Sequence, residues 1–379
     1  MITNLRLKSF TAFTELAIDF SPGINVIIGE NGTGKTQLLK AILALSGSEA
    51  RAEMAGEQVA RKLCRLYLPL SGKVGGLRCS GSRGEAMLNA GFASGEEVTV
   101  RFRGSDTATT VQVSGKASAV PAIFIPTKEV LSLARGLSSN KADTKTIELI
   151  FDDSYIDLAK LLFGRVGANL SKKIQEDPRL SSIIPRITNL IGGKYTLKAG
   201  NICFQAGKYK ETSGPGIEDE ETAGQVFKSS RVQFIPADSM QLSSSMTAEG
   251  FRKIGMLQRL LSNGSLIPGS TGPLLWDEPE SNLNPKLMKD LVLAFLELAR
   301  NGQQVILATH DYVLLKWFDL LMNKGKGDHV VFHRLYREAE SDGIQAESQP
   351  DYNIIGRSAI SNTFAELYDE DVKRALGGD

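Results

Sequence analysis

This chain of 379 residues has few cysteines, few histidines and a net charge near zero. Three cysteines, Cys64, Cys79 and Cys203, stand singly, with no CxxC pair and no histidine-rich neighbour. Their spacing excludes a disulfide framework and gives no zinc-binding pattern, so we expect core thiols. Lys and Arg total 44 against 43 Asp and Glu. This balance provides no global field to attract nucleic acid, although a local basic groove remains open.

Long apolar runs are missing as well. No stretch reaches the roughly 20 apolar residues that span a bilayer. The opening MITNLRLKSF lacks the basic and apolar regions of a secretory signal, so we expect a cytoplasmic protein that makes no membrane contact. The length exceeds a typical domain of about 150 residues, which predicts one large core with insertions or two lobes.

A glycine-rich motif lies between a predicted strand and a predicted helix near the start. The apolar run Ile24–Ile28 leads into GENGTGKT, which fits GxxxxGK[ST]. In this motif backbone N–H groups surround phosphates, Lys35 reaches the β- and γ-phosphate oxygens as a catalytic residue, and the Thr36 hydroxyl ligates Mg²⁺. An ordinary glycine turn before a helix is the alternative. The residues expected to bind nucleotide here are Gly29, Glu30, Asn31, Gly32, Thr33, Gly34, Lys35, Thr36 and Gln37.

Two adjacent carboxylates follow a second apolar strand, Leu274–Trp276. The carboxyl end of such a strand is where α/β sheets present ligands. Asp277 is therefore the expected metal residue, holding Mg²⁺ through water. Glu278 points to the other side and is the expected general base for the attacking water. The alternative is a helix-capping carboxylate beside a solvated one.

His310 follows a third apolar strand, Val305–Thr309, about 30 residues after Glu278. This spacing leaves room for one crossover helix, so His310 should emerge at the same sheet edge. We expect a catalytic switch residue that contacts the γ-phosphate, with a purely structural histidine as the alternative. His329 and His333 have no such placement.

The remaining patterns predict the organisation of the chain. Alternating stretches near 97–102 and 110–113 predict an antiparallel β flank. Helical periodicity predicts an insertion over 127–193, between a first part, 1–126, and a last part, 194–379.

Four local features are also predicted. Ser154 and Asp157 resemble a capping box, and a hairpin should turn at Ala199-Gly200-Asn201. The polar stretch Lys210–Glu221 should be an exposed loop, and a last helix should run near Thr363–Leu376.

These motifs together resemble ABC-type ATPase heads of the SMC, RecF and OLD group, often labelled AAA family ATPases in bacteria. The segments that carry the resemblance are residues 5–42, 247–266, 274–287 and 305–315, in the family's order. The resemblance implies an α/β fold, a P-loop NTPase of the ABC-ATPase head type with an antiparallel β flank and a helical insertion. It also implies ATP and Mg²⁺ as cofactors and a head-to-tail homodimer around them.

In that dimer each ATP lies between one subunit's P-loop and the other's signature helix. The matching signature is Ala248, Glu249 and Gly250 after Thr247, with alanine where a phosphate-bonding serine is common. The D-loop position matches residues 280–283, with a helix cap at Asn284 as the alternative. No glutamine follows the strand that ends at Pro126. Lys128 or Glu129 can take the Q-loop position, or both can be salt-bridged surface charges.

The segments IFIPTKEVLS, AEGFRK and DEPESNLNP resemble ATPase subunits of anti-phage systems of the Septu and PARIS kind. This resemblance implies a conformational switch that controls a separate effector protein, such as a nuclease.

A RecF-like repair ATPase that closes around DNA is the alternative, and Lys172, Lys173 and Arg186 would then line a basic groove. The same three residues can equally form a solvated helix face. A transporter subunit fits least well, because the LSGGQ signature is absent.

Overall fold

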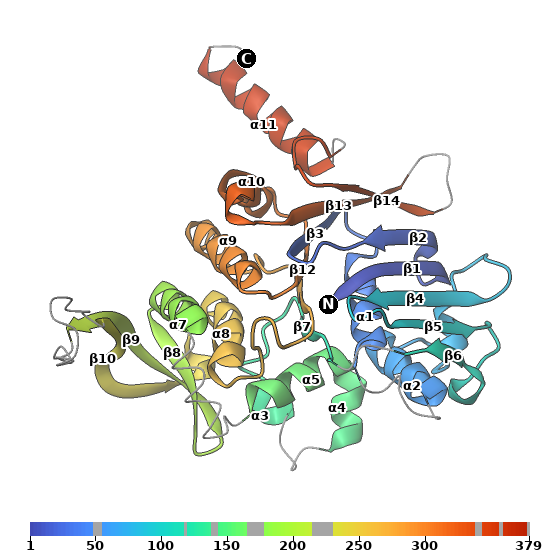
Figure 1. Cartoon of the computed structure of the whole chain (residues 1–379), viewed down its shortest axis with the longest axis horizontal. Coiled ribbons are helices and arrows are strands. Elements are labelled where there is room, and N and C mark those ends of the chain that lie inside the picture. The colour runs from blue at the N-terminus through green and yellow to red at the C-terminus, as the bar shows by residue number, and fades with distance from the viewer. Residues whose placement is uncertain are drawn as a thin grey trace, which may run out of the picture.

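The computed structural model describes residues 1–47, 55–116, 120–137, 143–164, 178–213, 230–337, 343–355 and 359–376. A six-stranded sheet with the order β14-β13-β3-β12-β11-β7 runs through the middle of the molecule (Figure 1). All neighbouring pairs are parallel except the edge pair of β13 and β14. Its strands are β3 (Ile24–Gly29), β7 (Ile123–Ile125), β11 (Leu274–Asp277), β12 (Val305–Thr309), β13 (Val330–Arg337) and β14 (Ile344–Gln349).

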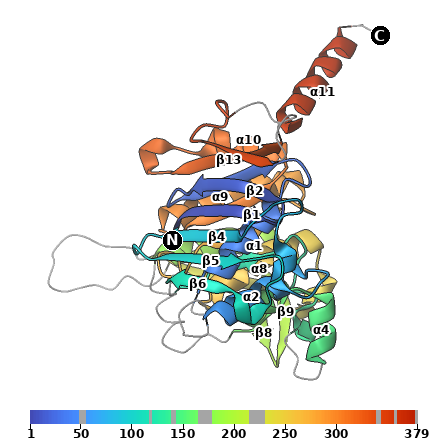
Figure 2. The same cartoon turned by 90° about the vertical axis from the view of Figure 1, so that its right-hand side faces the viewer.

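The predicted antiparallel β flank is present as a separate five-stranded sheet with the order β2-β1-β4-β5-β6. In Figure 1 helix α1 (Lys35–Leu45) lies between this flank and the parallel sheet. Helix α2 (Ala55–Tyr67) lies beside α1. Figure 2 shows the flank from its own side. Its strands are β1 (Ile2–Phe10), β2 (Phe13–Asp19), β4 (Ala86–Phe92), β5 (Glu97–Phe102) and β6 (Gln112–Gly115).

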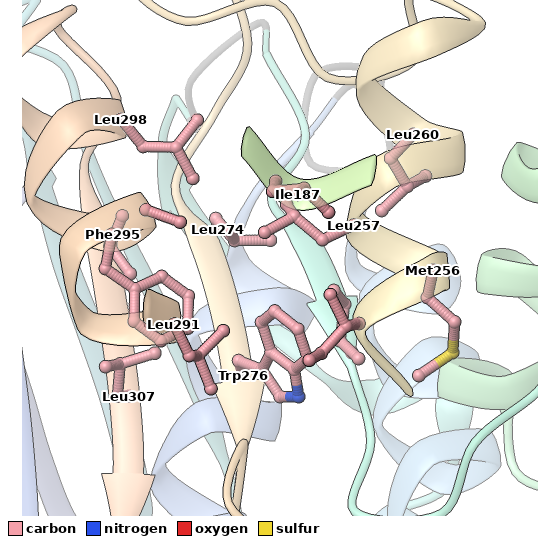
Figure 3. Packing of buried hydrophobic residues seen from close by; sticks show 14 of the residues in the cluster. Ile187, Met256, Leu257, Leu260, Leu274, Trp276, Leu291, Phe295, Leu298 and Leu307 are labelled. Carbon is pink, nitrogen blue, oxygen red and sulfur yellow. The ribbon is translucent and has the colours of Figure 1, made fainter. Parts of the chain in front are cut away.

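The parallel sheet separates two hydrophobic cores, because successive side chains of each strand point to opposite faces. Ile27 and Leu275 face the core that α1, α2 and the flank complete. Trp276 and Leu307 face the other core, with α8 (Glu249–Ser262), α9 (Pro285–Arg300) and α10 (Tyr312–Leu321). Figure 3 shows this face, where Trp276 lies between side chains of α8 and α9. Each fully buried large apolar side chain stabilises the fold by about 2 kcal/mol.

Helices dominate the segment that follows β7. They are α3 (Ala134–Leu137), α4 (Thr144–Ile150), α5 (Asp153–Leu162) and α7 (Pro178–Ile191). The capping prediction was displaced by two residues: Asp152, not Ser154, is the N-cap of α5, and it accepts from the Ser154 N–H at 2.8 Å. Asp152 also accepts from Lys40 of α1 at 2.7 Å, which ties the helices to the P-loop side of the molecule.

A small antiparallel sheet comes next, formed by β8 (Gly193–Lys198), β9 (Asn201–Ser213) and β10 (Ser230–Ser243). The predicted hairpin turn is confirmed, since Ala199 and Gly200 both have positive φ, as a two-residue type I′ turn requires. The exposed-loop prediction was wrong for residues 210–213, which belong to β9, and its remainder, 214–221, lies outside the described residues.

The last helix, α11 (Ala359–Ala375), begins four residues before its predicted start and projects from the body in Figures 1 and 2. Phe364 near its base stacks on Tyr312 with ring centroids 4.2 Å apart. Short 3-10 turns complete the described elements at Val74–Leu77, Ala108–Thr110, Ser244–Met246 and Lys324–Lys326.

The three cysteines are free thiols of intermediate burial. Cys64 packs against the core on the α1 side of the sheet, whereas the prediction of fully buried core thiols was wrong for Cys79 and Cys203. In the described part of the chain, no helix is both long and apolar enough to cross a membrane.

Candidate nucleotide site

The P-loop connects β3 to α1 at the carboxyl edge of the parallel sheet. Gly32 and Gly34 have φ of 81° and 83°, a left-handed backbone that favours glycine. A Cβ at Gly34 would meet the Phe13 ring at 2.6 Å, so this glycine is also required by packing. No side chain caps the start of α1, and its first-turn N–H groups have no partner within the helix. The loop therefore offers the backbone donors that an anion needs.

Lys35 lies within this loop and donates from Nζ to the carbonyl oxygens of Gly29 at 2.6 Å and Glu30 at 3.0 Å. Burial lowers the pKa of its ammonium, while the nearby carboxylates of Glu278 and Asp277 oppose that shift. The side chain of Gln37 turns the other way and accepts from the Ala12 N–H at 3.3 Å. The backbone N–H of Gln37, in the first turn of α1, can take the binding role that the sequence predicts.

Asp277 joins the P-loop to the end of β11, 241 positions later in the chain. Its Oδ2 accepts from the Thr36 hydroxyl at 2.7 Å and from the Thr127 hydroxyl at 3.0 Å. Burial raises the pKa of Asp277, and the two hydroxyl hydrogen bonds act against that rise. The predicted meeting of Thr36 with Asp277 is therefore present. Hydroxyl and carboxylate oxygens are the ligands that Mg²⁺ prefers, so this pair fits that ion.

Glu278 follows with φ of 47°, a left-handed conformation that is uncommon outside glycine. Its Oε1 lies 2.9 Å from Nδ1 of His310. The His310 side chain is 48% exposed, which is compatible with a role at an open ligand site. The ends of β11 and β12 thus bring Asp277, Glu278 and His310 to one edge, as their spacing predicts.

Lys253 of α8 is a site residue that the sequence-based reasoning missed. It is 1% exposed and donates from Nζ to the Thr127 carbonyl at 2.8 Å, to the Glu278 carbonyl and to the Ser281 hydroxyl. Burial lowers its pKa to about 8. A sequence signal existed, because Lys253 occupies the first position of the i, i+3, i+4, i+7 row that continues with Met256, Leu257 and Leu260.

Thr127 was missed too, and Glu280 was predicted only as part of the D-loop. Thr127 stands just after β7, whose carboxyl end meets the same sheet edge, so its position carried the signal. Glu280 is buried and accepts from the Thr309 hydroxyl at 2.6 Å. Burial raises the pKa of Glu280.

The signature segment lies beside the D-loop of its own chain. Glu249 accepts from the Asn282 side chain at 2.8 Å, and a Cβ at Gly250 would meet the Asn282 carbonyl at 2.7 Å. Helix α8 packs on the face of the parallel sheet opposite to α1. Ala248 is the N-cap of α8 and forms no side-chain cap. Residues 248–250 are thus assembled with the D-loop rather than with the chain's own P-loop.

The alternative interpretations at the D-loop and the Q-loop each hold in part. Asn284 does cap α9, accepting from the Lys286 N–H at 3.0 Å with Pro285 in the first turn. Glu129 is salt-bridged, to Arg252 of α8 at 2.8 Å, but it is buried rather than at the surface. Lys128 is exposed.

Comparison with known proteins places the motifs in context. A family described as "AAA domain" matches residues 4–177, and one described as "AAA domain, putative AbiEii toxin, Type IV TA system" matches residues 243–316. Models of AAA domains thus match both parts of the chain that contribute to the candidate site. The two matched ranges together include the P-loop, Asp277, Glu278 and His310, the residues that the structure brings together.

Curated relatives match this chain over a short segment. The DNA replication and repair protein RecF of Limosilactobacillus fermentum is 50% identical over 46 residues, 12% of each chain, and that of Halalkalibacterium halodurans is 49% identical over 53 residues, 14% of each. The matched segments thus span about an eighth of the length of these relatives.

Among solved structures, the SMC head domain of Thermotoga maritima is 15% identical, with a TM-score of 0.46, over 92% of this chain and 98% of that one. The Pyrococcus furiosus SMC head with an extended coiled coil, bound to the C-terminal domain of ScpA, is 14% identical, with a TM-score of 0.47, over 98% and 99%. The fold is the α/β P-loop fold of the ABC-ATPase head, as its parallel sheet, P-loop and β flank indicate.

Proposed function

We propose that this chain binds ATP with Mg²⁺ at the carboxyl edge of its parallel sheet and hydrolyses it. The observation that carries the proposal is the 2.7 Å hydrogen bond between the Thr36 hydroxyl and the Asp277 carboxylate, beside the paired Glu278 and His310. Thr36 and Asp277 would hold Mg²⁺, which supplies neutralising charge to the phosphates when bound.

The other residues of the site would have separate roles, each set by the chemistry of the group. The amides of the P-loop and the Lys35 ammonium would bind the phosphate oxygens. Glu278 would accept a proton from the attacking water, and His310, which it contacts at 2.9 Å, would orient that carboxylate and reach toward the γ-phosphate. The remaining loop residues, Gly29–Gly34, would shape the cradle.

The active form would be a homodimer. Ala248, Glu249 and Gly250 lie at the start of α8, which packs on the opposite sheet face from α1. A second copy that turns its α8 start toward this P-loop would complete each site, and the backbone N–H groups of that helix start would face the γ-phosphate. Asn282, which holds Glu249, would lie at the contact between the two copies.

Hydrolysis in this dimer would serve as a conformational switch for a separate effector protein, such as a nuclease, in cytoplasmic anti-phage defence. The head would consist of residues 1–126 and 194–379, and the insertion 127–193 would transmit the change. The resemblance of the motifs to Septu and PARIS subunits supports this assignment. The description of the C-terminal match as a putative toxin of a toxin–antitoxin system also accords with it.

A RecF-like role at DNA is the second candidate, favoured by the 46-residue match to RecF. Of the proposed basic lining, Lys172 and Lys173 lie outside the described residues, and Arg186 is paired with Glu297 at 3.3 Å. Salt-dependent binding of duplex DNA that requires ATP would favour this candidate over the effector switch.

Size measurement of three variants with and without MgATP tests the proposal. Glu278→Gln should retain binding and accumulate dimer, because only the proton acceptor is lost. Lys35→Ala should stay monomeric, because the phosphate contact is lost. Parent chain should dimerise transiently and release phosphate. An unchanged rate of hydrolysis in Glu278→Gln would refute the assigned base, and a monomer under all conditions would refute the dimer.

A further inference from the structure

The ammonium of Lys253 joins three segments that meet at the site. Its acceptors are the Thr127 carbonyl after β7, the Glu278 carbonyl after β11 and the Ser281 hydroxyl in the turn before α9. Ser281 in turn donates to the Thr127 carbonyl at 3.3 Å. A buried cation is costly unless its protons are all bonded, and an ammonium has three. The three acceptors match that number, so the buried ammonium can be fully hydrogen-bonded.

The contact bears directly on the backbone of Glu278. The N–H of Glu278 donates to the Ala308 carbonyl of β12 at 2.8 Å, and its carbonyl accepts from Lys253. Both peptide groups are thus fixed while the residue holds a φ of 47°, which costs about 1 kcal/mol for a residue with a Cβ. With the backbone fixed in this way, the carboxylate faces His310.

Helix α8 cannot shift without disturbing this arrangement. Its side chains Met256 and Leu257 pack with Trp276 in the core under β11, as Figure 3 shows. Met256 also accepts through its sulfur from the Val130 N–H at 3.3 Å, which ties the same turn of α8 to the segment after β7. Lys253 is the polar member of this row and the one that reaches Glu278.

We propose that Lys253 is a positioning residue that holds the backbone of Glu278 and couples the start of α8 to the general base. The inference rests on the proposed function. Lys253 follows Gly250 within one helical turn, so a change at the signature segment moves the donor that holds Glu278. Nucleotide engaged by the signature of one copy would therefore tune the base of that same copy, which faces the other nucleotide.

Three variants test this proposal. Lys253→Met keeps the aliphatic stem and removes the donors, and Lys253→Arg keeps the charge and the donors. Arg259→Met is the matched control, because Arg259 is also a buried cation of α8 and donates to the carbonyls of Leu162 and Gly164 at 3.0 Å, away from the site.

Lys253→Met should lower kcat about 10- to 100-fold, because a shift of about 1 Å in a catalytic group has that effect. Its Kd for a fluorescent non-hydrolysable ATP analogue should change less than about threefold. Lys253→Arg should recover part of the rate. Arg259→Met should lose thermal stability and keep its kcat per folded molecule.

The outcomes separate this inference from the function on which it rests. A parent chain that does not hydrolyse ATP overturns both. An active parent with equal kcat in Lys253→Met overturns the positioning role alone. Equal fractional losses of turnover, analogue binding and folded protein in Lys253→Met, without recovery in Lys253→Arg, also overturn it, since they would mark a purely structural residue.

Discussion

The two ends of the parallel sheet both bury polar side chains, but with different chemistry. The amino half holds Asn25, Gln304 and His333, which are neutral and whose polar atoms are bonded to protein partners. The carboxyl edge holds carboxylates and ammonium groups whose pKa values burial displaces, as at Asp277 and Lys253. Burial alone therefore does not mark the functional end of this sheet. The end that holds the candidate site is marked instead by buried charged groups that opposite charges and hydrogen bonds compensate only in part.

Gln304 illustrates the amino half. Its Oε1 accepts from the Ile2 N–H at 2.9 Å, and its Nε2 donates to the carbonyls of Ile2 and Ser21, each at 2.8 Å. The side-chain amide thus pairs with β1 as a strand would, and it fastens the flank to the parallel sheet. Its role is structural.

Asp277→Asn should give the largest effect and should separate activity from stability. Hydrolysis should fall about 10³-fold, or about 4 kcal/mol, because the charge that attracts Mg²⁺ is lost. The free energy of unfolding should stay equal or rise, since an amide oxygen can still accept from Thr36 and Thr127 without the cost of a buried charge. Phosphate release and urea unfolding measure the two effects. Asp371→Asn on exposed α11 is the control, and a marked loss of stability in Asp277→Asn alone would contradict the comparison.

Gln304→Ala should show the reverse pattern. It removes the partner of the Ile2 N–H and of the Ile2 carbonyl, while the Ser21 carbonyl still accepts from Asn25, so the free energy of unfolding should fall by about 3 kcal/mol. The kcat per folded molecule should not change. Denaturant unfolding and phosphate release check both, with exposed Gln112→Ala as the control. A loss of kcat as large as that in Asp277→Asn would contradict a purely structural role for the amino half of the sheet.

His333 gives the amino half a dependence on pH. Asn25 bonds Ser21 through both of its amide atoms, so its Oδ1 accepts from His333 Nε2–H, and His333 Nδ1 accepts from Ser348. Burial lowers the pKa of His333 to about 4, so the unfolded chain binds the proton first as pH falls. The linked stability is complete above the unfolded pKa of about 6.5 and is lost toward pH 4, by about 2 kcal/mol between pH 7 and pH 5.

His333→Gln should remove this part of the pH dependence, whereas exposed His329→Gln should retain it. Thermal unfolding from pH 7 to pH 5 measures the difference between the two variants. The raised pKa values of Asp277 and Glu280 act with the opposite sign and cancel in that difference. If thermal stability depends on pH equally in the two variants, protonation of His333 does not destabilise the fold.

Thr127→Val should give the smallest effect and should sharpen the description of the carboxyl edge. It removes one of the two hydroxyl groups that orient Asp277, so the affinity for Mg²⁺ in hydrolysis should fall about tenfold. Thr127→Ser keeps the hydroxyl and should behave like the parent chain. Magnesium titration of the hydrolysis rate makes the comparison. Equal magnesium dependence in all three chains would show that Thr36 alone suffices.

The sequence predicted the parts that local pattern and strand order determine. Periodicity and turn residues identified β5 and the hairpin at Ala199-Gly200. The rule that parallel strands end at one edge placed Thr36, Asp277 and His310 together.

The missed features depend on contacts between distant segments. Lys253 reads as one charged residue in a helix, and its three acceptors lie 126, 25 and 28 positions away. Asp152, the N-cap of α5, also accepts from Lys40 of α1, a contact between segments 112 positions apart. The helical row of Lys253 indicates that it faces the core, but no local pattern identifies its acceptors, because the packing of separate elements brings them together.

The left-handed backbone of Glu278 has a consequence for engineering this protein. Glycine adopts such a φ without penalty, so Glu278→Gly should make the fold slightly more stable, by about 1 kcal/mol. A library screened for heat resistance alone would therefore enrich glycine at this position and discard the proposed general base. At this position thermal stability and catalytic turnover favour different residues.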